Sequence, residues 1–481
     1  MHRALLLSEI IATILRAEIS SPGFLYTCLF INSAFSIEAT RILWDGCGAR
    51  YNSAAAGHVA PDIKDLARIV LQDPRRAQYY ANFIRILMFH DEGEANDFID
   101  EARWHRELAA IQFPMLEEVG LFESDNATSL NTGDAITHYA QPNVKYFTLR
   151  QGSLLSDSFL DTLHRSCPKL KSLTLNGTSD NTVSEDGLVR FLEGTNSLES
   201  LDFRTGLDGS WSCKALHVIT GYRNLKLLSI PDIQDDWIDS LRHASPIYPA
   251  FPNLKYFFTG TSDQGLEFLA LYAPNLDTLS LDLQNLPPSR YILASASKFT
   301  RLTSLAVHFS PQSTLTGHDL VVLTQKCPQL TDISIGEDEG SRPSGFGISD
   351  SIIDEVARNL PKLSQLILIF DNPGLLTWQS LLSFARHCKS LEMLKISCNV
   401  NWQEAVHGMQ ENIFSTLWSL EIVLDENNRD GKIADGSELD AFASRFAALV
   451  PKLTNFVIEG GNKTDESLEM AVGEICMARY Q

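Results

Sequence analysis

The stretch Pro274-Asn-Leu276-Asp-Thr-Leu279-Ser-Leu281 decides the fold, because its pattern returns along most of the chain. It reads L-x-x-L-x-L behind a proline, and Pro168–Leu175, Pro328–Ile335 and Pro361–Leu368 repeat it closely. The last three positions alternate apolar, polar, apolar, as a strand with one buried face requires. Counted by their first apolar residue, thirteen copies follow one another about 28 residues apart, at 116, 144, 170, 198, 225, 254, 276, 302, 330, 363, 391, 417 and 453.

Helical segments precede many of these strands. Ser184, Ser349 and Thr377 stand where a hydroxyl caps the first turn of a helix. In six repeats an apolar helix residue lies ten positions before the first strand residue, at 160, 188, 266, 320, 353 and 381. Strand, loop and helix therefore form one repeating unit, which buries both of its faces only by stacking on its neighbours. The expected fold is an α/β solenoid with a concave parallel sheet and convex helices.

This pattern resembles the leucine-rich repeat, and within it the cysteine-containing subtype. Cys167, Cys327 and Cys388 each lie three residues before the first strand leucine, where that subtype has its cysteine. We interpret these thiols as small buried hydrophobes; metal or redox chemistry is the alternative. The resemblance implies a horseshoe-shaped leucine-rich-repeat solenoid over roughly residues 113–460. It says little about function, because one fold serves many unrelated roles.

Residues 1–45 lack the repeat and predict three short helices, near Arg3–Ala17, near Phe24–Ala34 and from an N-cap at Ser36 to Trp44. Their apolar surface exceeds what so small a unit buries alone. The helices therefore either dock on the first repeats as a cap or bind a partner. The candidate partner-binding residues are Leu6, Leu7, Ile10, Ile11, Ile14, Leu15, Leu29 and Trp44.

These helices resemble the F-box. Leu6–Leu15 matches its opening L-P-x-E-I-L-x-x-I-L, with Leu7 in place of the proline, and Cys28–Phe35 matches C-x-L-V-N-x-x-F. Glu38–Trp44 matches the E-A-x-R-x-L-W of fungal members. Together with leucine-rich repeats, the resemblance implies the non-catalytic substrate-recognition subunit of an SCF-type ubiquitin ligase. In such a subunit the F-box binds the Skp adaptor, which attaches to the cullin scaffold, and the repeats hold a protein substrate.

The expected domains are an F-box-like helical module at 1–45, a helical linker and N-terminal cap at 46–112, and repeats with a C-terminal cap at 113–481. The aromatic-rich stretch Tyr79–Phe89 is expected to cover the first strand edge, because solenoid ends need caps. An aromatic ligand site is the alternative for this stretch.

Outward strand positions predict where the substrate binds. In the middle repeats these positions are small or polar, but two apolar groups interrupt them. Apolar clusters on an otherwise polar sheet mark binding surfaces; the alternative is that loops fold over them. The acidic stretches 336–347 and 425–440 are further candidates for recognition. The two groups are Leu227, Tyr256 and Phe258, and Ile367, Ile369 and Met393.

Composition also restricts which ligands and which compartment the sequence allows. The 481 residues carry a net charge of −21, so the chain repels nucleic-acid phosphates. No apolar run approaches the roughly 18 residues of a membrane span. The eight cysteines form no C-x-x-C pair and the twelve histidines lack metal-ligand spacing, so we expect neither metal nor cofactor. Unpaired thiols suit the cytoplasm or nucleus.

Sequence motifs for catalysis are equally scarce, with no phosphate-binding glycine loop and no hydrolase or zinc-protease signature. The segment from Glu426 echoes a calcium loop, but that loop needs Asp first and Glu at position twelve. We therefore expect an ordinary acidic loop there. Two other functions stay open: a leucine-rich-repeat scaffold with no ligase link, and an enzyme regulator that uses a loop arginine.

Overall fold

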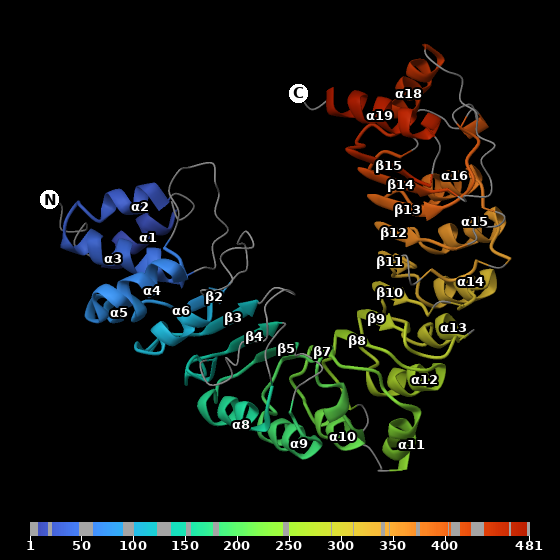
Figure 1. Ribbon diagram of the computed structural model, residues 1–481. Helices are drawn as coiled ribbons and strands as arrows, with labels where there is room; N and C mark the ends of the chain where they lie inside the picture. Colours follow the sequence, from blue (N-terminus) through green and yellow to red (C-terminus); the bar gives the residue numbers. More distant parts are fainter. Residues whose placement is uncertain are drawn as a thin grey trace. The chain divides into compact units, whose positions relative to one another are not determined.

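The chain folds into two compact units, Met1–Pro231 and Asp232–Gln481, and each is described by itself. Figure 1 shows the computed structural model. It describes residues 8–17, 22–47, 61–89, 101–122, 136–150, 155–176, 182–243, 250–289, 291–310, 312–337, 342–345, 347–371, 376–402, 404–405, 414–424, 437–460 and 463–478.

The first unit begins with three helices and continues as strand–helix repeats. Its strands β1 to β7 each pair in parallel with the next. Helices α8, α9 and α10 follow one side of these strands (Figure 1). The sheet begins at Gly46. Residues 46–112, which were expected to form a helical linker and cap, therefore contribute the first two strands, β1 and β2. The elements are α1 (Ser8–Ala17), α2 (Pro22–Cys28), α3 (Ser33–Trp44), β1 (Gly46–Cys47), α4 (Ile63–Gln72), α5 (Pro74–Ala81), β2 (Ile86–Phe89), α6 (Glu101–Leu108), β3 (Glu118–Phe122), β4 (Tyr146–Arg150), α8 (Asp157–Ser166), β5 (Ser172–Asn176), α9 (Glu185–Gly194), β6 (Ser200–Asp202), η4 (Asp208–Ser210), α10 (Cys213–Thr220) and β7 (Leu227–Ser229).

The second unit repeats the same strand–helix alternation. Its strands β8 to β15 form a parallel series in chain order. Helices α12 to α16 lie along one side of β8 to β13 (Figure 1). The elements are α11 (Asp235–His243), β8 (Tyr256–Thr259), α12 (Asp263–Tyr272), β9 (Thr278–Asp282), α13 (Ile292–Ala296), β10 (Ser304–His308), α14 (Gly317–Lys326), β11 (Asp332–Ile335), α15 (Asp350–Asn359), β12 (Gln365–Leu368), α16 (Trp378–His387), β13 (Met393–Ser397), β14 (Ser419–Val423), α18 (Ser437–Leu449), β15 (Asn455–Glu459) and α19 (Lys463–Ala478).

The predicted strand register is confirmed. Leu279 and Leu281 are fully buried, whereas Ser280 between them faces the open side of the sheet. Leu279 pairs in register with Phe257 on one side and Leu305 on the other. The six helix residues at the fixed offset are buried as well, so strand and helix share one core and the fold is an α/β leucine-rich-repeat solenoid. These six are Leu160, Leu188, Leu266, Leu320, Ile353 and Leu381.

Hydrogen bonds between aspartates and hydroxyls join neighbouring repeats at the helix starts. Asp157, the first residue of α8, accepts hydrogen bonds from the backbone N–H of Ser184 at 2.8 Å and from its hydroxyl at 2.7 Å. Ser184 in turn caps α9 by accepting from the Gly187 N–H. Gly187 leaves room for this contact, because a Cβ there would lie 2.0 Å from the Asp157 carboxylate. Asp350 and Thr377 repeat the arrangement between α15 and α16, and we name these pairs the aspartate ladder.

The recurring cysteines are packed, as the favoured interpretation predicts. The Cys327 thiol donates to the carbonyl of Phe299 at 3.4 Å, and the Cys388 thiol donates to that of Leu360 at 3.4 Å. Burial raises the pKa of Cys327 to about 11 and that of Cys388 to about 12. These thiols therefore stay protonated and tie each repeat to the preceding one.

The N-terminal caps of two helices differ from the sequence prediction. Helix α2 ends at Cys28 and α3 begins at Ser33, because the Asn32 side chain accepts from the N–H groups of Ala34 and Phe35 at 2.9 and 3.1 Å. Ser36 is therefore inside α3 rather than its cap. Ser349 precedes α15 as expected, but its hydroxyl makes no cap bond and lies 2.9 Å from the Ser351 hydroxyl instead.

Candidate protein-binding surfaces

Helix α1 carries one broad apolar stripe, and about half of it is exposed. Ile11 and Leu15 are fully buried against the rest of the first unit, whereas Ile10 and Ile14 are 38% and 40% exposed. Each pair is spaced four residues apart, so its members lie one above the other on the helix. An amphipathic surface helix normally shows a polar face to solvent. The exposed half of this stripe, Ile10 and Ile14, is therefore a candidate contact surface.

The neighbouring helices extend this exposed apolar character. Phe30 is 88% exposed and Ile31 51% exposed in the turn after α2, and Ile37 on α3 is 50% exposed. Of the fifteen large apolar side chains exposed among the described residues, six come from this three-helix region. We name these six residues the N-terminal apolar surface: Ile10, Ile14, Phe24, Phe30, Ile31 and Ile37.

Only part of the predicted adaptor-binding set lies on this surface. Ile10 and Ile14 do, and Leu29 is half-buried. Ile11, Leu15 and Trp44 are buried, so the expectation that they face a partner is corrected. Leu6 and Leu7 lie outside the described residues. The predicted set does not include the exposed residues Phe24, Phe30, Ile31 and Ile37. Phe30 and Ile31 were expected inside the second helix, but they follow it.

Trp44 has a structural role instead. Its ring stacks on that of Tyr80 in α5, with centroids 4.7 Å apart and planes 10° from parallel. The Arg76 Nε–H donates to the Tyr80 hydroxyl at 2.9 Å and holds that ring in place. Trp44 thus attaches the three-helix module to the helices that follow it.

The first predicted substrate group is partly exposed. Tyr256 and Phe258 lie on one face of β8, where Tyr256 is 46% exposed and Phe258 half-buried. Their neighbours on β9 are Thr278 and Ser280, so two aromatic rings stand beside a polar stretch of sheet. Leu227 is half-buried in the first unit.

The second predicted group is not an exposed cluster. Ile367 is 9% exposed and Ile369 is fully buried, and both pack with Val423; Met393 is half-buried. The ladder of β11 and β12 continues beside them, since the Ile369 N–H donates to the Ile335 carbonyl at 3.0 Å. The expectation that the two isoleucines form an exposed contact group is therefore corrected.

A network of ion pairs joins the neighbouring strands β13, β14 and β15. Lys395 on β13 lies 2.9 Å from a Glu421 carboxylate oxygen and 2.8 Å from one of Glu459 on β15. Arg342, from the stretch after β11, lies 3.6 Å from the other Glu459 oxygen. Burial alone lowers the pKa of Lys395, but hydrogen bonds to Glu459 and Glu421 outweigh it and raise the pKa. Lys395 is therefore a fixed cation between two carboxylates.

Metal-binding clusters and membrane-spanning helices are both absent from the described residues. These residues contain no group of three or more histidine, cysteine, aspartate or glutamate side chains placed to hold a metal ion. None of the helices they form has both the length and the apolar character to cross a membrane. The stretch that echoes a calcium loop, 426–437, lies almost wholly outside them.

Two solved structures are similar to this chain at low sequence identity. No protein-family model matches the chain, and no curated protein matches it. The leucine-rich-repeat-containing protein LegL7 from Legionella pneumophila is similar at 11% identity and a TM-score of 0.32, over 74% of this chain and 97% of that one. A structure of the Rad7 and Elc1 complex from yeast is similar at 12% identity and a TM-score of 0.38, over 83% and 92%. The fold class itself follows from the repeats described above.

Proposed function

We propose that this chain is a non-catalytic substrate receptor of an SCF-type ubiquitin ligase, and that its N-terminal apolar surface binds the Skp adaptor. The observation that carries the proposal is the exposed half of the apolar stripe of α1, formed by Ile10 and Ile14. Apolar residues that gather on one exposed surface mark a contact with a partner. The resemblance of this segment to the F-box indicates which partner covers it.

The exposed residues supply enough apolar area for such a contact. Full burial of one large aliphatic or aromatic side chain contributes about 1.5–3 kcal/mol. Phe30, at 88% exposure, has most of that contribution still to gain, and Ile10 and Ile14 have somewhat under half. Aromatic side chains such as Phe30 are enriched at the centre of protein interfaces.

The test is copurification of the full chain with a recombinant Skp adaptor. Ile14→Asp places a carboxylate in the contact and is expected to abolish binding without changing the melting temperature, since Ile14 is 40% exposed in the free chain. Leu71→Asp is the matched control, because Leu71 in α4 is 59% exposed but lies outside the surface. Adaptor binding that survives Ile14→Asp and Phe30→Asp would overturn the proposal.

A second function is a leucine-rich-repeat scaffold with no ligase link, in which the three helices only cap the sheet. The stack of Trp44 on Tyr80 favours it, together with β1, which directly follows α3 and pairs with β2. A cap predicts that the wild-type chain does not bind the adaptor. It also predicts that Trp44→Ala lowers the melting temperature of the repeats.

For the substrate, the aromatic pair Tyr256 and Phe258 is the proposed contact. The double variant Tyr256→Ala with Phe258→Ala is expected to stay folded and to lose capture of the protein that the wild-type chain retains in a pull-down. Unchanged capture would move the site elsewhere on the repeats. The proposed compartment is the cytoplasm or nucleus, where the eight free thiols stay reduced.

A further inference from the structure

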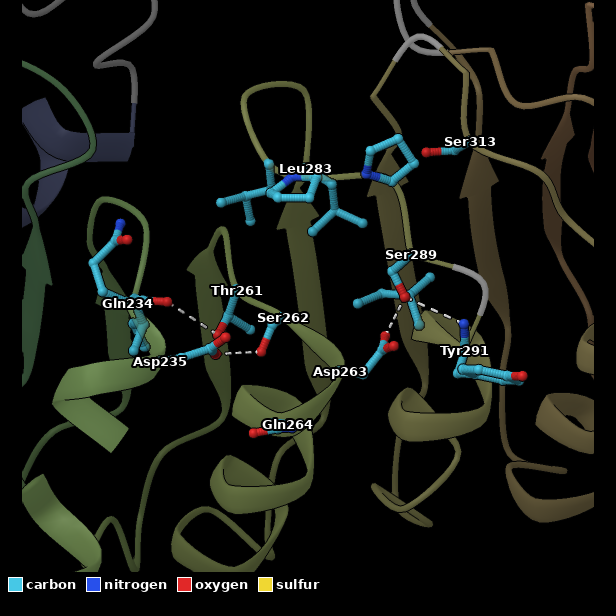
Figure 2. A pocket seen from close by; sticks show the side chains of 15 residues that line it. Gln234, Asp235, Thr261, Ser262, Asp263, Gln264, Leu283, Ser289, Tyr291 and Ser313 are labelled. Carbon is cyan, nitrogen blue, oxygen red and sulfur yellow. Dashed lines mark hydrogen bonds between the residues drawn. The ribbon is translucent and has the colours of Figure 1, made fainter. Parts of the chain in front are cut away.

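Successive repeats cover one another's polar groups inside the second unit. Figure 2 shows this at a pocket beside the starts of α11, α12 and α13, where Ser262 donates to Asp235 and Ser289 donates to Asp263. Strands β9 to β14 likewise have a hydrogen-bonded strand on each side. Within the described part of the chain β15 has such a neighbour, β14, on one side only. The other edge of a last strand offers its N–H and C=O groups to any further strand unless something covers it.

The hydrogen bonds of β15 identify which of its backbone groups face this outer edge. In a parallel ladder alternate residues bond to opposite sides. The N–H of Asn455 and the carbonyl of Glu459 bond to residues that flank β14, at 3.0 and 2.9 Å. Phe456 and Ile458 therefore direct their N–H and C=O groups to the outer edge. There the Ile458 N–H donates to the carboxylate of Glu469 in α19, at 2.9 Å.

An apolar stripe holds α19 over this edge. Leu468, Val472 and Cys476 are spaced four residues apart on one side of the helix and are buried. The helix packs on β15 and α18, and Met470 on its other side is exposed. The stripe places Glu469 so that its carboxylate oxygen accepts the Ile458 N–H, as the carbonyl of an added strand would. Helix α19 therefore occupies the position of a further strand.

We propose that the outer edge of β15 is a strand-addition site that α19 holds closed, and that its occupant, once α19 leaves, is the β15 edge of a second copy of this chain. An exposed edge binds an extended segment through main-chain hydrogen bonds. The site lies wholly in the second unit, so the proposal is independent of adaptor binding by the N-terminal apolar surface.

The sequence of β15 is complementary to itself. Two copies related by a two-fold axis through Val457 pair in antiparallel fashion. Phe456 then lies opposite Ile458, so the residues whose backbone groups face outward bond to each other. Asn455 lies opposite Glu459, so an amide meets a carboxylate and no like charges oppose each other. This self-complementarity favours a second copy as the occupant.

Hydrogen exchange of the Ile458 amide in the full chain, followed by mass spectrometry, tests whether Glu469 covers the edge. Glu469→Ala removes the acceptor and is expected to speed this exchange about tenfold or more, because hydrogen bonds to charged groups are among the stronger ones. Glu469→Gln keeps an acceptor oxygen and is expected to exchange more slowly than Glu469→Ala. The matched control is Glu474→Ala, which removes an exposed carboxylate from the same helix. Unchanged exchange in Glu469→Ala, or equal acceleration in Glu474→Ala, would overturn the proposal.

Release of α19 tests the occupant. Leu468→Asp with Val472→Asp places two charges in the buried stripe and is expected to free the edge. Light scattering should then give twice the mass of one chain for this variant, with the Ile458 amide protected in the dimer. Met470→Asp, at an exposed position of α19, should keep the mass of the wild-type chain. A folded double variant that stays a single chain contradicts the proposal, as does a dimer in which the Ile458 amide exchanges rapidly.

A milder variant covers the case in which the double variant does not fold. Glu469→Ala leaves the apolar stripe intact, so the repeats should keep their wild-type circular dichroism. It is expected to dimerise at a lower concentration than Glu474→Ala, because its edge opens more often. Equal dimerisation of these two variants would show that α19 does not guard the edge.

Discussion

Replacing one strand leucine by alanine measures how strictly the repeat register is set. Leu279 is fully buried and lies between Phe257 and Leu305 on the adjacent strands. Both neighbours belong to a continuous sheet that cannot collapse into the space left behind. Leu279→Ala should therefore cost about 2–5 kcal/mol, the range for buried leucines. Ser280, one residue later, faces the open side, and Ser280→Ala should change stability by less than about 0.5 kcal/mol.

Urea unfolding followed by circular dichroism gives the difference between the two variants. In a unit of this size 1 kcal/mol shifts the melting temperature by about 2–4 °C, so Leu279→Ala should melt at least about 4 °C below Ser280→Ala. Equal shifts would show that the side chain of Leu279 does not enter the core. A reversed order would place Ser280 inside and move the register by one residue, which turns every side chain to the other face.

Three further predictions concern other parts of the chain. Asp350→Ala should destabilise the second unit by about 2–4 kcal/mol in urea unfolding, because Asp350 accepts three hydrogen bonds from Thr377 and Ser380; a loss under 0.5 kcal/mol would mean that the ladder adds little. Burial lowers the pKa of His105 to about 4 from 6.5, so its contribution to stability is complete above pH 6.5 and falls by roughly 3 kcal/mol towards pH 4. In a His105→Phe chain the free energy of unfolding, measured by urea unfolding between pH 4 and 7, should lack this part of its dependence on pH. Cys388 should resist a thiol reagent at pH 8 until the chain unfolds, since burial raises its pKa to about 12; fast labelling of Cys388 would contradict its packing.

The repeating part of the fold was predictable from sequence because two periods coincide. The strand pattern around Leu279 and the helix residue ten positions before each strand both specify burial, and the structure buries both. The buried thiols of Cys327 and Cys388 followed from the same spacing. Where each residue has an equivalent in other repeats, one correct assignment extends to all of them.

The errors lie where the repeat offers no equivalent. Asn32 and Ser36 both suit an N-cap, and only the hydrogen bonds of the Asn32 side chain settle the start of α3. Ile367 and Ile369 were assigned to the open face by alternation, but both are buried and pack with Val423. Alternation gives the side of the sheet on which a side chain lies, but not what else packs on that side. The hydrogen bond between α19 and the β15 edge also went unpredicted, because it joins the last strand to a helix with no equivalent in the other repeats.

The aspartate ladder also sets a spacing rule for the chain. Its rungs join residues 27, 27, 26 and 27 apart: Asp157 to Ser184, Asp235 to Ser262, Asp263 to Ser289 and Asp350 to Thr377. An insertion or deletion inside one of these four intervals separates a carboxylate from its hydroxyl partner and leaves a helix start without its acceptor. We therefore expect changes in length to be tolerated less well inside the ladder intervals than in the other connections, where the repeats counted in the sequence start up to 36 residues apart.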